Sequence, residues 1–186
     1  MTFWNSNQVE PKRAFRFLLS LTPLNATHSI ASYYVKSVKK PQFQMDGQGE
    51  VKYIQHTFKY PGRITWQPID VTLIDPATPD SAAIMMNILN ESGYNQPDSL
   101  PNAHTSISKL GANTAMGSVF LNQIDADGMP ISEWQLWNPF LTNVDFGSVD
   151  YGTDDVVEYT LTIDYDYATF KSMGLTPTNV NSGVTH

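Results

Sequence analysis

A chain of 186 residues can bury one sizeable core, and its length favours a single domain over 1–186. It contains no Cys, which excludes disulfides and thiolate metal sites. The net charge of −7 is uneven, because nine Lys and Arg against three acids give +6 over 1–63 and two against fifteen give −13 over 64–186. Lys36, Lys39 and Lys40 form a basic cluster that is weak for nucleic-acid binding and typical of a solvated edge strand.

The two ends of the chain, 1–12 and 174–186, lack apolar periodicity. Residues 174–186 carry too few bulky apolar side chains to offset the entropy of ordering, so we expect both ends to be flexible. The start lacks the basic cluster and apolar run of a signal peptide, and no stretch approaches the roughly 20 apolar residues of a membrane span. We therefore expect synthesis in the cytoplasm and no membrane partner.

Between the two ends a two-residue period dominates the chain, as in β-strands. In the first half of the chain, three segments fit strands: 15–21, 32–38 and 51–60. The apolar positions of 64–66 and 69–73 lie on opposite parity, and Pro68 stands at the switch. The sequence therefore predicts a bulge or a bend at Pro68.

One helix is predicted from about 78 to 92. Thr78 can act as the N-cap, with Pro79 at the first helical position and Asp80 complementing the helix dipole, and Gly93 can close the C-terminus. The apolar stripe has helical spacing: Ala82, Met85, Met86 and Leu89. We expect this stripe to pack on one opening of a barrel or one edge of a sandwich, and a Met-rich binding groove is the alternative.

The pattern is lost from 95 to 115, a loop long enough to be either functional or ordered only on assembly. Beyond it, 117–124 and 131–137 predict two strands, and Asp127-Gly128 between them predicts a hairpin turn. A calcium loop is the competing interpretation of this turn. It fails because Trp134 stands where the bidentate Glu of an EF-hand belongs.

The clearest strand is predicted over 157–167. Its alternation sends Tyr159, Leu161 and Ile163 to the core. The acidic side chains of Glu158, Asp164 and Asp166 then fall on the opposite face. With no internal repeat, the expected architecture is mainly β: an antiparallel barrel or sandwich with one flanking helix.

Motifs that carry catalysis or hold a cofactor are absent from the sequence. The four His have no paired metal-ligand spacing, and no nucleophile elbow, phosphate-binding loop or dinucleotide fingerprint occurs. The C-terminal acids offer no pair that stands out as a glycosidase couple. We therefore expect no enzyme activity, no cofactor and no metal site.

A run of motifs in the second half has a specific order and spacing: Trp134-x-Leu136-x-Asn138-Pro139-Phe140, Val144-x-Phe146-Gly147-x-x-Asp150-Tyr151, Asp154-Asp155, Glu158 and Tyr165-Asp166. Two further motifs lie upstream, Lys39-Lys40-Pro41 and Trp66-x-Pro68-Ile69. Over roughly 13–170, the chain therefore resembles the tail tube proteins of contractile-tailed bacteriophages.

The resemblance implies a structural virion protein whose six copies close into a ring around one inner barrel, with rings stacked as the tail tube. Genomic DNA would pass through without specific binding, and the sheath, baseplate and tail-terminator proteins would be its neighbours. An acidic lumen would repel phosphate, and Glu158, Asp164 and Asp166 are the candidate lumen-facing acids. The candidate assembly contacts are Lys36, Lys39, Lys40, Asp154 and Asp155.

Two other functions remain open. A tube protein of a contractile injection apparatus, or of the baseplate end of a tail, would share the fold and differ in its neighbours. A carbohydrate-binding sandwich is supported by Trp4, Trp66, Trp134 and Trp137. Because Trp134 and Trp137 differ in parity, a regular strand cannot present both to one sugar.

Overall fold

The computed structural model describes residues 11–22, 34–47, 49–78, 80–95, 106–152 and 154–173. The two predicted flexible ends lie outside these residues, except for Pro11 and Lys12. Within the described residues, no helix has the length and apolar character needed to span a membrane.

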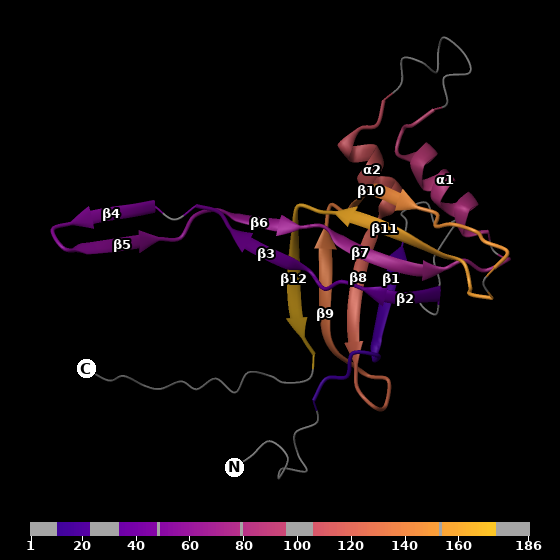
Figure 1. The fold of residues 1–186 in the computed structure, drawn as a ribbon, viewed down its shortest axis with the longest axis horizontal. Helices are drawn as coiled ribbons and strands as arrows, with labels where there is room; N and C mark the ends of the chain where they lie inside the picture. Colours follow the sequence, from indigo (N-terminus) through magenta and orange to yellow (C-terminus); the bar gives the residue numbers. More distant parts are fainter. Residues whose placement is uncertain are drawn as a thin grey trace.

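Two four-stranded antiparallel sheets form the body of the molecule. Sheet A has the order β1 (Phe17–Thr22), β8 (Ser118–Ile124), β9 (Pro130–Trp137), β12 (Tyr167–Ser172). Sheet B has the order β10 (Phe140–Asp145), β11 (Glu158–Asp164), β7 (Ile69–Ile74), β2 (Val35–Val38). The strands of the two sheets cross at a steep angle in Figure 1, and the mainly β, antiparallel class expected from the sequence is confirmed.

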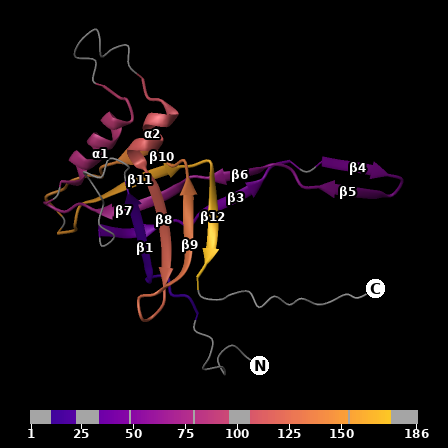
Figure 2. The same ribbon diagram turned by 180° about the vertical axis from the view of Figure 1, so that it is seen from behind.

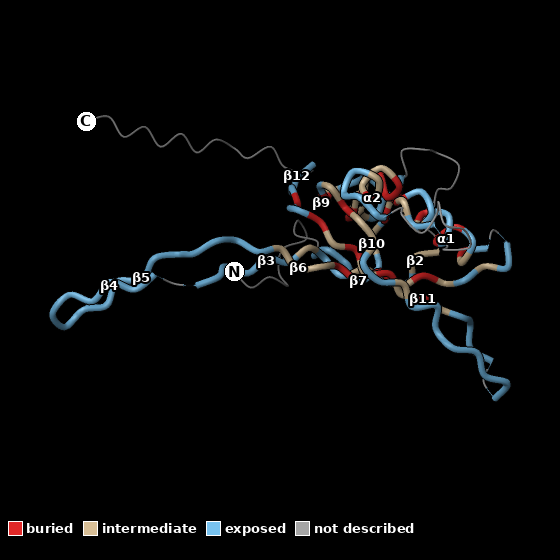
Figure 3. The backbone as a smooth tube through the Cα atoms, turned by 90° about the horizontal axis from the view of Figure 1, so that it is seen from above, coloured by how far each residue is buried: buried red, intermediate tan, exposed pale blue. Residues whose placement is uncertain are grey.

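The core lies between the sheets, where alternate side chains of each strand point inward. The most deeply buried side chains come from both sheets: Leu19, Ile69, Val71, Leu73, Val119, Leu161 and Ile163. Figure 3 shows this buried layer in red at the crossing of the sheets. Each such side chain stabilises the fold by about 1.5–3 kcal/mol relative to an exposed one.

The β8–β9 hairpin has the predicted turn at Asp127-Gly128. Gly128 adopts a φ of 81°, and the Asp125 carboxylate accepts hydrogen bonds from the backbone N–H groups of Asp127 (2.9 Å) and Met129 (2.8 Å). The Asp125 side chain therefore holds the turn backbone in place.

Helix α1 (Ser81–Glu91) has its N-cap two residues later than predicted. Asp80 is the N-cap and accepts from the N–H groups of Ala82 (2.9 Å) and Ala83 (3.3 Å), so the assignment of Thr78 was wrong. The buried stripe is also rotated by one residue from the predicted one: Ser81, Ile84, Met85 and Ile88. Both stripes have helical spacing, so spacing alone could not distinguish them.

A second helix, α2 (Lys109–Met116), overlaps the end of the segment 95–115 that we expected to be a loop. Ser108 caps it by accepting from the N–H of Gly111 at 3.0 Å, and Gly117 ends it with a φ of 68°. A Cβ on Gly111 would lie 2.7 Å from the carbonyl oxygen of Ser92, so Gly111 allows α2 to approach the end of α1 closely. The expectation of a single helix was therefore wrong.

Two predicted strands are each divided in the structure. The segment 51–60 forms a hairpin of β4 (Gly49–Tyr53) and β5 (His56–Tyr60), which reverses at Ile54. The segment 157–167 breaks after Asp164, and β12 then continues in the other sheet. The predicted break at Pro68 is confirmed, because β6 (Ile64–Gln67) ends just before it.

Candidate assembly surfaces

A long two-stranded arm, residues 42–67, projects from one end of sheet B. Its proximal part pairs β3 (Gln42–Met45) with β6, and its distal part is the β4–β5 hairpin. Figures 1 and 2 show the arm leaving the body on one side of the molecule. At its base, Trp66 packs against the core residue Tyr165 with ring centroids 6.0 Å apart.

The distal hairpin is amphipathic although every residue in it is exposed. The cross-strand pairs Val51–Phe58 and Tyr53–His56 share one face with Tyr60, while Glu50–Lys59 and Lys52–Thr57 share the other. Figure 3 shows both of its strands in the colour of exposed residues. An apolar face of this size on an isolated ribbon indicates that another surface covers it.

The two parts of the arm meet at a tight crossing of the backbone. The N–H of Asp46 donates to the carbonyl of Arg63 at 2.7 Å, and Gly47 has a φ of 41°. A Cβ on Gly62 would lie 1.6 Å from the carbonyl oxygen of Asp46, a distance that no side chain tolerates. Glycine at position 62 is therefore required by the crossing.

The outer face of sheet B is polar and acidic. Threonines and acids alternate with the core residues along β7 and β11: Asp70, Thr72, Glu158, Thr160, Thr162 and Asp164. The Thr162 hydroxyl donates to Asp70 at 3.1 Å, and Lys36 from β2 forms an ion pair with Glu158. Among the described strands of this sheet, β2 and β10 form the two edges.

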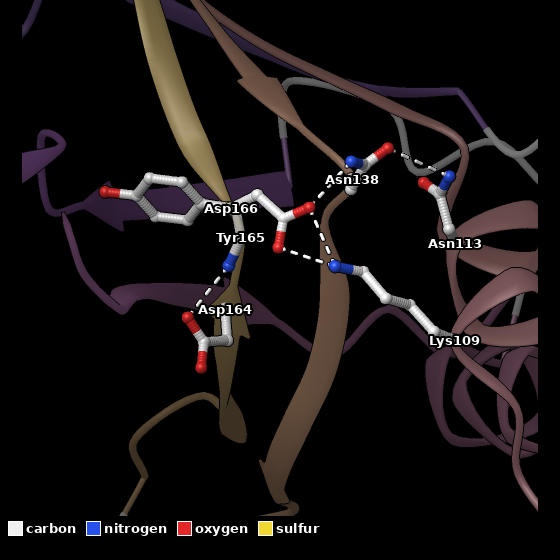
Figure 4. Close-up of polar contacts among 6 residues, drawn as sticks. All are labelled: Lys109, Asn113, Asn138, Asp164, Tyr165 and Asp166. Atoms are coloured by element: carbon white, nitrogen blue, oxygen red, sulfur yellow. Dashed lines mark hydrogen bonds and ion pairs between the residues drawn. The ribbon is translucent and has the colours of Figure 1, made fainter. Parts of the chain in front are cut away.

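Two of the three candidate lumen acids, Glu158 and Asp164, lie on this outer face at opposite ends of β11. Asp166 does not share that face, because it lies in the turn between β11 and β12. Its carboxylate accepts from Lys109 Nζ (2.7 and 2.8 Å) and from Asn138 Nδ2 (2.7 Å), as Figure 4 shows. The Lys109 hydrogen bond, with that of Asn138, holds the pKa of Asp166 below its usual range.

The candidate assembly contacts are scattered. Lys36 is engaged with Glu158, and Lys40 Nζ donates to Gln123 Oε1 at 2.9 Å. Lys39 is exposed at the base of the arm. Asp154 and Asp155 are exposed in the β10–β11 loop, residues 146–157, at the other end of sheet B.

Two hollows adjoin β2. The first, about 670 Å³, is mostly apolar and lies between β2 and the β1–β8 side of sheet A, with Lys36 and Lys40 among its lining residues. The second, about 720 Å³, lies between β2 and the β10–β11 loop, where Asp150, Asp155 and Glu158 line it with valines. Neither the two hollows nor the arm could be predicted from the sequence, since all three depend on how the strands pair.

Ionisable groups buried in the core are tyrosines. Burial raises the pKa of Tyr165 to about 12 and also raises the pKa of Tyr159, so both phenols stay protonated at neutral pH. Among the described residues, no group of three or more His, Cys, Asp and Glu side chains could hold a metal ion. Trp134 lies against Phe170 and Trp137 against Tyr167, on opposite faces of sheet A.

The fold is similar to those of several known structures. No family model and no curated protein matches the chain. A chain of the anti-feeding prophage (AFP) baseplate has a TM-score of 0.64 at 13% identity, with 90% of this chain and 100% of that chain covered. A chain of the PVC sheath–tube complex, an extracellular contractile injection system in its extended state, has a TM-score of 0.60 at 17% identity, with 92% and 99% covered.

The Hcp1 protein of the E. coli EAEC 042 pathovar is similar as well, with a TM-score of 0.51 at 10% identity and coverage of 86% of this chain and 93% of that chain. The molecule is thus a crossed β-sandwich with an extended arm. Its fold is that of the tail-tube and Hcp proteins of contractile injection systems, so the resemblance found in the sequence is confirmed at the level of fold.

Proposed function

We propose that this chain is a structural protein that closes into six-membered rings and stacks as the inner tube of a contractile tail or injection apparatus. The observation that carries this proposal is the pair of open edges of sheet B. Adjacent strands of the sheet alternate in direction and number four, so β2 and β10 run in opposite directions. Rotation of one copy about a central axis therefore brings its β10 beside the β2 of the next copy as an antiparallel pair.

Ring closure also accounts for the outer face of sheet B. Once the edges join, this face of Thr and acidic side chains lines the inner wall, where water and a passing cargo meet it. Carboxylates repel nucleic-acid phosphate, which suits a conduit that must not bind DNA. In this arrangement Asp70 joins the two earlier candidates, Glu158 and Asp164, as a lumen-facing acid, and Asp166 does not.

In isolation the β2 edge is poorly suited to pairing. It is short, its register shifts between Val35 and Ser37, and Lys36 projects from the irregularity. Short, bulged, lysine-bearing edges protect free sheets from indiscriminate pairing. In the proposed ring, β2 pairs with the β10 of a neighbouring copy, because the remaining contacts between the two copies hold that strand in position.

The neighbours of the proposed tube are a sheath, a baseplate and a terminator protein, in a virion tail or an injection particle. The sheath–tube, baseplate and cap assemblies that contain similar folds support these partners. A phage tail tube that conducts DNA is one candidate, and an injection apparatus is the other. The AFP and PVC structures favour the second, and the gene neighbourhood, with or without capsid genes, distinguishes the two.

Negative-stain microscopy of the purified chain tests the proposal. We expect six-fold rings or hollow tubes, with subunit contacts in the range of roughly 2,000 Å² or more that obligate assemblies bury. A protein that stays monomeric at high concentration under all salt conditions would overturn the assignment.

A further inference from the structure

The first hollow beside β2 is an apolar surface that the described residues leave open. Phe17, Leu121 and Trp134 line it from three neighbouring strands of sheet A, and Val35 lines it from β2. At its edge, the side chain of Phe15 is 75% exposed. A volume of about 670 Å³ is in the range of pockets that hold a ligand or several side chains, so the hollow has room for an occupant.

The described part of the chain begins beside this hollow. Lys12 Nζ donates to Ser132 Oγ of β9 at 3.0 Å, and Gln123 Nε2 of β8 donates to the carbonyl of Arg13 at 3.2 Å. Phe15 then lines the hollow. These contacts fix the point at which the preceding segment of the chain joins the body of the molecule.

This preceding segment, residues 1–10, carries the kinds of side chain that such a hollow binds. Phe3 and Trp4 are adjacent aromatic residues, and the one charged side chain is that of Glu10. The chain from Trp4 to Pro11 spans at most roughly 25 Å when it is extended. That reach exceeds the width of the hollow, because a cube of the same volume has an edge of about 9 Å. A segment that has no core of its own becomes ordered when it binds such a surface.

Lys40 places a positive charge near the start of the described chain. Its side chain lines the hollow, and within the described residues Lys40 Nζ donates to the neutral amide oxygen of Gln123 at 2.9 Å. The same amide group holds the carbonyl of Arg13. Gln123 thus brings the Lys40 ammonium close to a point three residues from Glu10, which has the opposite charge.

Two other occupants of the hollow fit less well. The segment 174–186, at the other end of the chain, contains no aromatic and no acidic side chain. Residues 1–10 of a second copy have no tether to this hollow, whereas a tethered segment has an effective concentration on the order of mM. The observations therefore favour residues 1–10 of the same chain.

We infer that residues 1–10 of each chain fold back into the first hollow of the same chain, with Phe3 and Trp4 against its apolar lining and Glu10 facing Lys40. This contact lies within one copy, so the inference goes beyond the proposed function and does not depend on it. Among the described strands, β2 is hydrogen-bonded to β7 alone. Apolar side chains packed behind β2 therefore stabilise an edge strand that has a neighbour on one side.

Cross-linking tests the docking, because the chain has no Cys and an engineered pair is unique. Ser6→Cys places one thiol in the segment, and Ser37→Cys places the other at an exposed position that lines the hollow. With a short bis-maleimide, we expect a link between positions 6 and 37 within a single chain, identified by peptide mapping of the monomer band on a denaturing gel.

The control pair is Ser6→Cys with Asn90→Cys. Position 90 is exposed on α1, which Figures 1 and 2 show far from the start of the described chain. Because its effective concentration near the segment is lower, this pair should link at least about ten-fold more slowly.

A serine variant tests the aromatic contact. Phe3→Ser with Trp4→Ser removes both aromatic side chains and should slow the link between positions 6 and 37 by about ten-fold or more. In unassembled protein, it should also make the Lys39 amide, which donates to a carbonyl of β7 at 2.9 Å, exchange hydrogen about five-fold faster. Mass spectrometry of the peptide that contains β2 measures this exchange. The matched control is Asn5→Ser with Asn7→Ser, which should behave like wild type.

Each outcome supports or overturns the inference. Linkage within one chain that requires the aromatic pair supports it. Equal linkage in the two cysteine pairs, no effect of the serine variant, or an equal loss in the asparagine control overturns it. If mixing the two single-cysteine variants gives a covalent dimer linked between positions 6 and 37, the segment docks in another copy and the inference is also wrong. Absence of rings and tubes in the wild-type protein refutes the proposed function and leaves this inference standing.

Discussion

Asp166 links parts of the chain that are far apart in sequence. Its carboxylate binds Lys109 of α2 and Asn138 of the β9–β10 turn, and Asn138 in turn accepts from Asn113 of α2 at 3.3 Å. Asn138 has a φ of 52°, which Asn tolerates better than most residues. The network therefore fixes α2 against the two turns where the chain passes between the sheets.

The lowered pKa of Asp166 predicts a pH-dependent stability. Since ionisation is favoured in the folded state, its contribution is full above the ordinary pKa of 3.8 and is lost as pH falls through the lower folded value. Asp166→Asn should lower the free energy of unfolding at pH 7 by about 1 kcal/mol or less, because both partners are solvent-accessible. Urea unfolding from pH 7 to pH 3 should show the gap closing, with Asp127→Asn as control. A gap constant over this range would contradict the ion-pair role.

A substitution at Gly62 is expected to loosen the backbone crossing in the arm. Gly62→Ala places a Cβ 1.6 Å from the Asp46 carbonyl, so the backbone must move and the Asp46–Arg63 hydrogen bond must weaken. We expect the Asp46 amide to exchange hydrogen about ten-fold faster, measured by NMR. Gly49→Ala is the control, because its Cβ would meet only the Cβ of Tyr60 at an ordinary 3.8 Å. Equal exchange in the two variants would show that the crossing is not rigid.

At the scale of elements, α1 offers a matched pair of adjacent methionines. Met85 is 2% exposed in the core, whereas Met86 is 37% exposed beside β10. Met85→Ala should lower the free energy of unfolding by about 2–5 kcal/mol, the usual cost of such a cavity. Met86→Ala should cost less than about 1 kcal/mol, as measured by urea unfolding. Equal losses would mean that the helix presents a different face to the core.

The sequence predicted those elements whose local pattern and tertiary role agree. The alternation in β11 marked its core face correctly, the segments 117–124 and 131–137 were correctly predicted to be strands, and Asp127-Gly128 marked the turn between them. Helix α2 was missed because it contains Gly111, Asn113 and Thr114, which are poor helix formers, and because its buried residues are mostly small.

The β4–β5 turn was missed for a different reason. It reverses at Ile54, which is 86% exposed and has a φ of 51°, a conformation that a β-branched residue rarely adopts. The one available signal was a change of parity, from Val51 and Tyr53 to Phe58 and Tyr60. The arm and its apolar face could not be predicted without that turn, since the pairing of β4 with β5 creates the face.

At the scale of the whole molecule, reversing the charge on the outer face of sheet B should change how assembled rings interact with DNA. Asp70→Lys with Asp164→Lys changes two acids on this face, and the rings should still form. Their inner wall should then bind DNA at about 50 mM salt and release it by about 200 mM, because binding depends on counterion release. A gel-shift assay on assembled rings measures this, with Asp127→Lys in the β8–β9 turn as control. If rings of the double variant do not bind DNA at low salt, this face does not line the channel.

The exposed apolar face of the arm makes a single copy of the chain prone to aggregation. A two-stranded ribbon with one apolar face and free backbone groups along both of its edges is a template for indiscriminate aggregation. The opposite face of the distal hairpin carries Glu50, Lys52 and Lys59, charges of the kind that act as gatekeepers beside aggregation-prone strands. Under the proposed function, chains that have not yet assembled depend on these three residues for solubility.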